Sequence, residues 1–286
     1  MLYKYTHLIK MEPGCYFLGD IGCLNTELEQ IIGVIKSRFR LGEKIFLLGD
    51  NFYNNGVLTV TDPLWDVYKS IFERLKFHNI YSVLGNHDYE GNPYAQLTSP
   101  FVMSKDFYYK YKFSEKTELF LLDTIQLLPN HCSINCRDMI RVHNKTYKEL
   151  EEKQLEWLKT SLSESRAINK IVLGHYPLIR NGCYNQCLGP LCNKLMPIFE
   201  KYDVRTYICG HEHNIQYIEQ RYENYKFNQF IVGSSSEYRE IDYKVHQHKD
   251  MYDATDNFYL KMDESGNRLV FDLVNKNGVL KYCYII

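Results

Sequence analysis

Five short apolar runs along this chain end in the same way, at a glycine that is followed at once by polar side chains. These endings are Gly19-Asp20, Gly49-Asp50, Gly85-Asn86-His87-Asp88, Gly174-His175 and Gly210-His211-Glu212-His213. Short apolar runs bounded by turn residues predict buried strands. Because open α/β sheets place their ligands at the carboxyl ends of strands, we expect the five endings to converge on one site.

The segments between these runs predict helices over the first two thirds of the chain. Thr26 and Glu29 have the spacing of a capping box, as do Thr146 and Glu149, and Asp62-Pro63 is typical of a helix start. Further helical and strand patterns lie at 191–202, 107–113, 119–122, 215–218, 230–232, 258–262, 269–273 and 280–285. We therefore expect one domain over residues 1–286, of α/β class, built as a β-sandwich flanked by helices.

Charge and hydropathy exclude several classes of protein. Lys plus Arg number 34 and Asp plus Glu 35, so the net charge of −1 argues against nucleic-acid binding through an overall positive field. No run of 18 apolar residues occurs, so we expect no membrane span. Polar residues interrupt the N-terminal segment, and we see no secretory signal there. These observations favour a globular protein without a targeting segment.

The polar residues at the five endings are typical metal ligands. Carboxylate and imidazole together suit iron, zinc and manganese, and one carboxylate can bridge two ions. Two ions about 3.5–4 Å apart can bind a phosphate between them and acidify a water molecule. A single Gly-Asp or Asn-His-Asp is more often an ordinary turn, but five such endings in order predict a metal pair.

At these residues the chain resembles the purple acid phosphatases, which belong to the calcineurin-like metallophosphoesterases. The resemblance is greatest for the small, tartrate-resistant type. It rests on Asp20-Ile21-Gly22, Gly49 to Tyr53, Gly85 to Asp88, Leu122-Asp123-Thr124, Val172 to Pro177 and Cys209 to Tyr217. It extends from about Tyr16 to the C-terminus. It implies a four-layer α/β/β/α sandwich with a dinuclear metal site at the carboxyl ends of the strands.

Carried over residue by residue, the resemblance implies two metal positions. The first would hold ferric iron, through Asp20, Asp50, Tyr53 and His213. The second would hold Fe(II), Zn or Mn, through Asp50, Asn86, His175 and His211. Tyr53 discriminates most, because phenolate is a hard donor that suits Fe(III) and the broader superfamily lacks a tyrosine at this offset from Asp50.

The implied activity is that of an acid phosphatase, a hydrolase of phosphate monoesters that uses a metal-activated hydroxide. Asn86, His87 and His211 would contact the substrate, and His87 would be catalytic by pairing with the phosphate and protonating the leaving oxygen. The residues leave open a second role for His87, which is to orient a ligand. They also leave two roles open for Asp88, which could orient His87 or cap an ordinary turn. The family's further histidine after the His-Tyr-Pro segment is absent here, and Arg180 and Asn181 are the polar residues nearby.

Two other functions stay open. The first alternative is another calcineurin-like phosphoesterase that acts on diesters, nucleotides or phosphoproteins. The second is a non-catalytic relative that uses the fold for binding. As partners we expect a small phosphomonoester or a phosphoprotein, and no nucleic acid. We expect a monomer.

Nine cysteines are unusual for a chain of this size, and five lie between Cys132 and Cys192. The resemblance implies a disulfide that joins Cys132 or Cys136 to Cys192, over the active site. Structural zinc and free thiols are the alternatives. Compartment stays open, since the cysteines favour an oxidising environment and the missing signal a cytoplasmic one. The resemblance also implies that a loop at 129–146 limits access to the site until it is cleaved.

Overall fold

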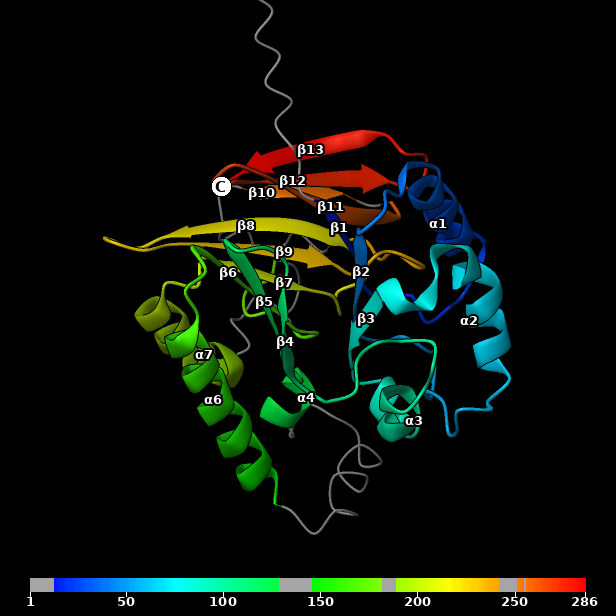
Figure 1. Ribbon diagram of the computed structural model, residues 1–286, viewed down its shortest axis with the longest axis horizontal. Helices are drawn as coiled ribbons and strands as arrows, with labels where there is room; N and C mark the ends of the chain where they lie inside the picture. Colours follow the sequence, from blue (N-terminus) through cyan, green and yellow to red (C-terminus); the bar gives the residue numbers. More distant parts are fainter. Residues whose placement is uncertain (1–12, 129–145, 182–188, 242–250, 255) are drawn as a thin grey trace, which may run out of the picture.

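The structure, a computed structural model, describes residues 13–128, 146–181, 189–241, 251–254 and 256–286. Its strands form two sheets (Figure 1). The first has the order β13 (Leu280–Ile285), β12 (Arg268–Asn275), β11 (Phe258–Ser265), β1 (Cys15–Leu18), β2 (Lys44–Leu48) and β3 (Ile80–Val83). The second has the order β10 (Met251–Ala254), β8 (Ile215–Arg221), β9 (Lys226–Val232), β7 (Thr206–Cys209), β6 (Asn169–Leu173), β5 (Thr117–Leu121) and β4 (Tyr109–Lys112).

Helices cover the outer face of each sheet, as Figure 1 shows. The α-helices are α1 (Thr26–Arg38), α2 (Leu64–Phe72), α3 (Pro93–Leu97), α4 (Thr124–Leu127), α6 (Tyr147–Glu164) and α7 (Gly189–Tyr202). Short 3-10 helices are η1 (Glu73–Leu75), η2 (Phe77–Asn79) and η3 (Asp88–Glu90). None of these helices combines the length and apolarity needed to cross a membrane.

Three apolar cores hold the layers together. Side chains such as Phe17, Phe46 and Phe230 pack between the two sheets. Ile31 and Ile32 of α1 pack with α2 against the outer face of the first sheet, whereas helices α6 and α7 cover the second sheet. Three cores between successive layers make a helix–sheet–sheet–helix sandwich, so the predicted fold class is confirmed.

Most predicted elements form, with two corrections at helix starts. The capping box of Thr146 and Glu149 is present at α6. At α1 the expected cap was wrong by one residue, since the side chain of Asn25, and not Thr26, accepts the backbone N–H of Leu28 at 3.2 Å. Asp62 accepts the N–H of Leu64 at 3.1 Å, but Pro63 lies just before α2 instead of inside it. The sequence pattern missed α3, α4 and β10.

The parallel strands direct their carboxyl ends to one region. In the first sheet β1 pairs parallel with β2, and β2 with β3. In the second sheet β5, β6 and β7 are parallel neighbours. Backbone bonds link the loops that follow, since Asp20 N–H donates to the carbonyl oxygen of Gly49 at 3.1 Å and Gly210 N–H donates to that of His175 at 3.1 Å. The topology therefore gathers the five glycine endings at one edge of the sandwich.

Candidate metal centre

The backbone turns sharply at four of the predicted ligands. Asp20, Asp50, His211 and His213 all have positive φ angles, of 57°, 51°, 75° and 50°. Non-glycine residues rarely adopt this left-handed region, and such conformations cluster at functional sites. Each turn lies close after the end of a strand, so the strained residue is the one whose side chain enters the site.

Two of the glycine endings leave room for carboxylates. A Cβ atom at Gly85 would collide with the carboxylate and the backbone nitrogen of Asp50. A Cβ atom at Gly210 would collide with the Asp20 carboxylate. Glycine is therefore required at both positions by close approach of the neighbouring strand end.

The first group of side chains surrounds the Tyr53 hydroxyl. It lies 3.0 Å from Asp20 Oδ1, 3.3 Å from Asp50 Oδ2 and 2.9 Å from His213 Nε2. His213 Nε2 also lies 3.5 Å from Asp20 Oδ1. All four residues predicted for the first metal position are therefore together, and Asp20 and Asp50 are almost fully buried.

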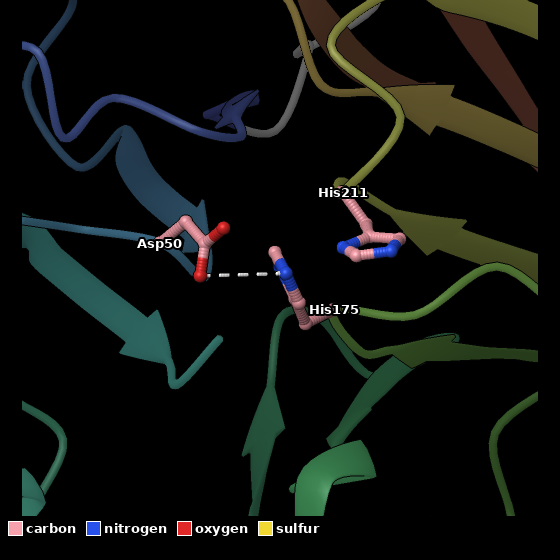
Figure 2. A group of neighbouring side chains, drawn as sticks. All are labelled: Asp50, His175 and His211. Atoms are coloured by element: carbon pink, nitrogen blue, oxygen red, sulfur yellow. Dashed lines mark ion pairs between the residues drawn. The ribbon is translucent and has the colours of Figure 1, made fainter. Parts of the chain in front are cut away.

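The second group shares Asp50 with the first. His175 Nε2 lies 3.5 Å from Asp50 Oδ1 and 3.1 Å from Asn86 Oδ1. Figure 2 shows Asp50 and His175 pointing toward each other from the ends of β2 and β6, with the ring of His211 beside them. The His175 and His211 rings meet edge to face at 5.1 Å. The four residues predicted for the second position are thus also together.

The donor atoms of both groups fit metal ions. One ligand atom each from Asp20, Asp50 and His213 lies within 4.8 Å of the others, and the same holds for Asp50, His175 and His211. Carboxylate, imidazole and phenol oxygen or nitrogen donors suit iron, zinc or manganese. Since Asp50 belongs to both groups, the arrangement fits two ions that share one carboxylate. The assignment of each residue as a ligand stays a prediction.

The two buried carboxylates differ in their electrostatics. Burial opposes charge on both, yet the charge of His175 lowers the pKa of Asp50, which stays ionised. Burial and the negative charge of Asp50 raise the pKa of Asp20 well above its usual range. Burial beside the two carboxylates also raises the pKa of Tyr53, which keeps the phenol protonated in the metal-free protein. A cation between them would offset these penalties, because an opposite charge within about 4–6 Å favours the ionised form.

The histidines divide between charged and neutral forms. Burial opposes charge on His175, yet Asp50 and Asp20 raise its pKa to about 9. Burial, together with the charge of His175, lowers the pKa of His211. Burial, with Arg239 nearby, lowers the pKa of His213 to about 4. Neutral imidazole is the metal-binding form, so His211 and His213 are ready to bind without losing a proton.

His87 lies at the edge of the two groups. Its backbone N–H donates to Asp50 Oδ1 at 2.9 Å, and its Nδ1 lies 2.6 Å from the carbonyl oxygen of Asn54. Its ring meets that of Tyr53 edge to face at 4.8 Å. The structure therefore places His87 beside the first group with one ring nitrogen held by the backbone. Its catalytic role, like the substrate contacts predicted for Asn86, His87 and His211, stays a prediction.

The carboxylate of Asp88 is occupied by partners other than the ring of His87. It accepts the backbone N–H of Gly85 at 2.8 Å and of Asn51 at 2.9 Å, and the amide of Gln96 at 2.8 Å. These bonds join the loops that follow β2 and β3. Of the two possibilities left open by the sequence, the structure supports a structural role in the loop.

Arg180 and Glu212 form an ion pair beside the second group. Arg180 Nη1 contacts Glu212 Oε1, and the two side chains are only 12% and 13% exposed. Asn181 lies next to them, where its backbone N–H donates to Gln216 Oε1 at 2.9 Å. The loop after β6 therefore brings Arg180 near His211, through the ion pair with the neighbouring Glu212.

Of the cysteines in the predicted disulfide, the structure describes only Cys192. Cys132, Cys136, Cys183 and Cys187, and the loop at 129–145, lie outside the described residues. Cys192, in α7, is disulfide-bonded, whereas Cys15, Cys23, Cys209 and Cys283 are free thiols. Pairing of Cys192 with Cys132 or Cys136 therefore stays a prediction.

Asp123 and Thr124, which the resemblance included without a role, support the backbone at His175. Thr124 Oγ1 accepts the backbone N–H groups of His175 at 3.2 Å and of Tyr176 at 3.0 Å. The carboxylate of Asp123 caps the short helix α4 by accepting N–H groups of Ile125 and Gln126. Asp123 is the sequence signal for this support, because aspartate is a preferred residue at a helix N-cap.

Comparisons with known proteins agree with this geometry. The family model described as calcineurin-like phosphoesterase matches residues 15–214. Tartrate-resistant acid phosphatase type 5 of Oryctolagus cuniculus is 33% identical over 61% of this chain and 56% of its own length. Purple acid phosphatase 3 of Arabidopsis thaliana is 30% identical over 81% of this chain and 67% of its own. The chain thus spans little more than half the length of the first of these relatives.

Two solved structures have a similar fold. One is described as GAP50, the anchor in the inner membrane complex of Plasmodium, with a TM-score of 0.77 and 23% identity, over 96% of this chain and 88% of that one. The other is purple acid phosphatase PPD1 of Lupinus luteus, with a TM-score of 0.73 and 15% identity, over 95% of this chain and 53% of that one. Sheets, strand-end ligands and sequence agree, and the chain belongs to the calcineurin-like phosphoesterase family.

Proposed function

We propose that this protein is an acid phosphatase that hydrolyses phosphate monoesters at a dinuclear metal centre. The observation that carries the proposal is that Asp50 belongs to two groups of donor atoms at once, one with Asp20 and His213 and one with His175 and His211. Two adjacent cations at these groups would supply positive charge to bind a phosphate dianion. The relatives named as acid phosphatases support the same reaction class.

The proposal assigns Fe(III) to the first group and Fe(II), Zn or Mn to the second. Tyr53 favours iron at the first position, because a phenolate suits a hard trivalent ion and the hydroxyl already contacts Asp20 and His213. When bound, the ions supply charge for the phosphate and acidify a water molecule. Asn86 lies beside His175 and completes the second group through its side-chain oxygen.

The protein's own residues then bind the substrate and manage its protons. His87 Nδ1 is held by the carbonyl oxygen of Asn54, so Nε2 is the nitrogen assigned to the substrate. In its protonated form His87 pairs with the phosphate and gives the Nε2 proton to the leaving alkoxide. Tyr53 packs edge to face on the His87 ring and restricts its rotation.

The test combines metal analysis with visible spectroscopy and turnover of p-nitrophenyl phosphate. Wild type is expected to contain iron, absorb visible light through its tyrosinate ligand, and turn over the substrate at acid pH. Tyr53→Phe is expected to lose the absorption, whereas Tyr222→Phe, at an exposed tyrosine of the β8–β9 hairpin, is expected to keep it. Zinc or manganese alone, with no absorption in wild type, would refute the ferric assignment.

The same measurements separate the two alternatives. Turnover of diesters or nucleotides in preference to monoesters would favour another phosphoesterase activity. No turnover with both metals bound would favour a binding protein, since GAP50, a neighbour in fold, is an anchor in the inner membrane complex of Plasmodium. The presence of all seven predicted ligands in two compact groups supports the catalytic alternative.

A further inference from the structure

The two ring nitrogens of His213 have different surroundings. Nε2 faces the first group, 2.9 Å from the Tyr53 hydroxyl and 3.5 Å from Asp20 Oδ1. Nδ1 is buried and makes no hydrogen bond within the part of the chain that the structure describes. The carboxylate of Glu237 lies 3.7 Å from it. A buried polar nitrogen without a partner is costly, so this carboxylate is the group that relieves the cost.

The backbone that carries Glu237 is tied to the metal centre on both sides. Before it, Ser236 Oγ donates to the carbonyl oxygen of Asp20 at 2.5 Å, and the side chain of Asn25 donates to the carbonyl oxygen of Ser236 at 2.8 Å. After it, Arg239 N–H donates to the carbonyl oxygen of His213 at 2.6 Å. Glu237 therefore has a fixed backbone position relative to both Asp20 and His213.

A small rotation of the Glu237 side chain would bring its carboxylate within hydrogen-bond distance of His213 Nδ1. The distance of 3.7 Å exceeds the 2.7–3.2 Å of an N–H···O bond. The Glu237 side chain is 49% exposed, so it has freedom to rotate toward Nδ1. The thiol of Cys23 contacts the same carboxylate oxygen at 3.8 Å.

We propose that Glu237 is a positioning residue for His213, accepting Nδ1–H and so presenting Nε2 to the first metal position. A histidine ligand that donates its other N–H to a carboxylate is fixed in tautomer and ring orientation and becomes a stronger donor. The inference rests on the proposed function, because it assigns Nε2 to a metal. Nothing in the glycine endings pointed to Glu237, which enters the site from the loop after β9.

The ring of His175 is oriented in a different way from that of His213. His175 Nδ1 lies 2.9 Å from the carbonyl oxygen of Leu48, so the backbone orients this ring. No side-chain substitution removes that partner. For His213 the partner is the side chain of Glu237. A substitution of Glu237 therefore alters the orientation of His213 while all seven predicted ligands stay unchanged.

The experiment compares metal retention by wild type, Glu237→Gln, Glu237→Ala and the control Glu240→Gln. Glu240 is an exposed glutamate in the same segment. Each metal-free protein is loaded with Fe(III) and, separately, with Zn(II), and the metal is then withdrawn with a graded chelator. Bound metal and the tyrosinate absorption are recorded, with the thermal midpoint of each metal-free protein.

Glu237→Ala is expected to release metal at roughly 10–100-fold lower chelator concentration than wild type, the usual cost of losing such a partner. Glu237→Gln should fall between them, since its amide oxygen still accepts Nδ1–H. Glu240→Gln should match wild type, and all metal-free midpoints should coincide. Equal retention by wild type and Glu237→Ala overturns this inference alone. A wild type that retains neither metal overturns the proposed function, and this inference with it.

Discussion

Four buried aspartates near the strand ends form two contrasting pairs. Asp88 and Asp123 are surrounded by donors of the protein itself, from Gly85, Asn51 and Gln96 to the first and from the backbone of α4 to the second. Asp20 and Asp50 each accept one backbone N–H and otherwise face Tyr53 and the histidines. Of these four carboxylates, Asp20 and Asp50 therefore have the fewest backbone donors.

The difference separates carboxylates that hold the fold from carboxylates that are placed to bind a cation. A carboxylate with several N–H donors is a complete hydrogen-bonding unit, and losing it leaves buried donors unpaired. Asp20 faces another carboxylate and a phenol, and burial with the charge of Asp50 raises its pKa, so its ionised form is costly until a cation binds. The first pair should therefore matter to stability without metal, and the second to metal binding.

Asp20→Asn should have the largest effect on function and little effect on the metal-free fold. Burial and Asp50 already favour the neutral form of Asp20, so an uncharged isostere fits the metal-free site. Loss of a direct ligand should lower metal retention and p-nitrophenyl phosphate turnover by about 100-fold or more. Loss of a residue that only hydrogen-bonds a ligand typically costs about 10–100-fold. Marked destabilisation of the metal-free variant in urea would break the comparison.

Asp88→Asn should show the opposite behaviour. The substitution replaces one acceptor oxygen by an NH2 group, which opposes the donors from Gly85, Asn51 and Gln96. Leaving buried donors unpaired should cost about 1–3 kcal/mol in the free energy of unfolding of the metal-free protein. Urea unfolding monitored by circular dichroism measures it, and a midpoint equal to wild type would contradict the structural role.

Asp123 should make the stability of the metal-free protein depend on pH. Burial raises its pKa to about 7, although the bond from Tyr89 opposes the shift. The folded state then binds the proton more tightly than the unfolded chain, where the pKa is about 3.9. The contribution is complete below pH about 4 and is lost as the pH rises through about 7.

Asp123→Asn tests this pH dependence while keeping a capping oxygen for helix α4. Relative to the variant, wild type should lose stability between about pH 4 and 7 in thermal unfolding scans of the metal-free proteins. A constant difference across this range would show that Asp123 does not titrate there. Asp123 would then stabilise the fold through its hydrogen bonds alone.

The smallest expected effect concerns the neutral side chain that caps helix α1. Asn25 caps helix α1 and also donates to the carbonyl oxygen of Ser236 at 2.8 Å. Asn25→Ala should cost about 1 kcal/mol of stability, whereas Thr26→Ala, at the cap expected from sequence, should cost less. A larger loss in Thr26→Ala would reverse the assignment of the cap.

Much of the site was predictable because its residues directly follow apolar runs. The glycine endings locate Asp20, Asp50, Asn86, His175, His211 and His213 at strand ends, and parallel topology brings strand ends to one edge. Asp88 was located but its role was undecided, since its donors include Asn51, which is distant in sequence, and Gln96 of the unpredicted helix α3. Glu237 was missed because its loop follows β9 and carries no glycine-ligand pair.

By itself the sequence determined the alternation of elements, the glycine endings and the types of donor atom, because all three depend on neighbours along the chain. Only the tertiary structure decided which carboxylates face protein donors and which face each other. It also decided that Asp50 joins two groups and that His213 Nδ1 lies near Glu237. These relations depend on distances of a few ångström between loops from both sheets, and packing of the whole sandwich sets those distances.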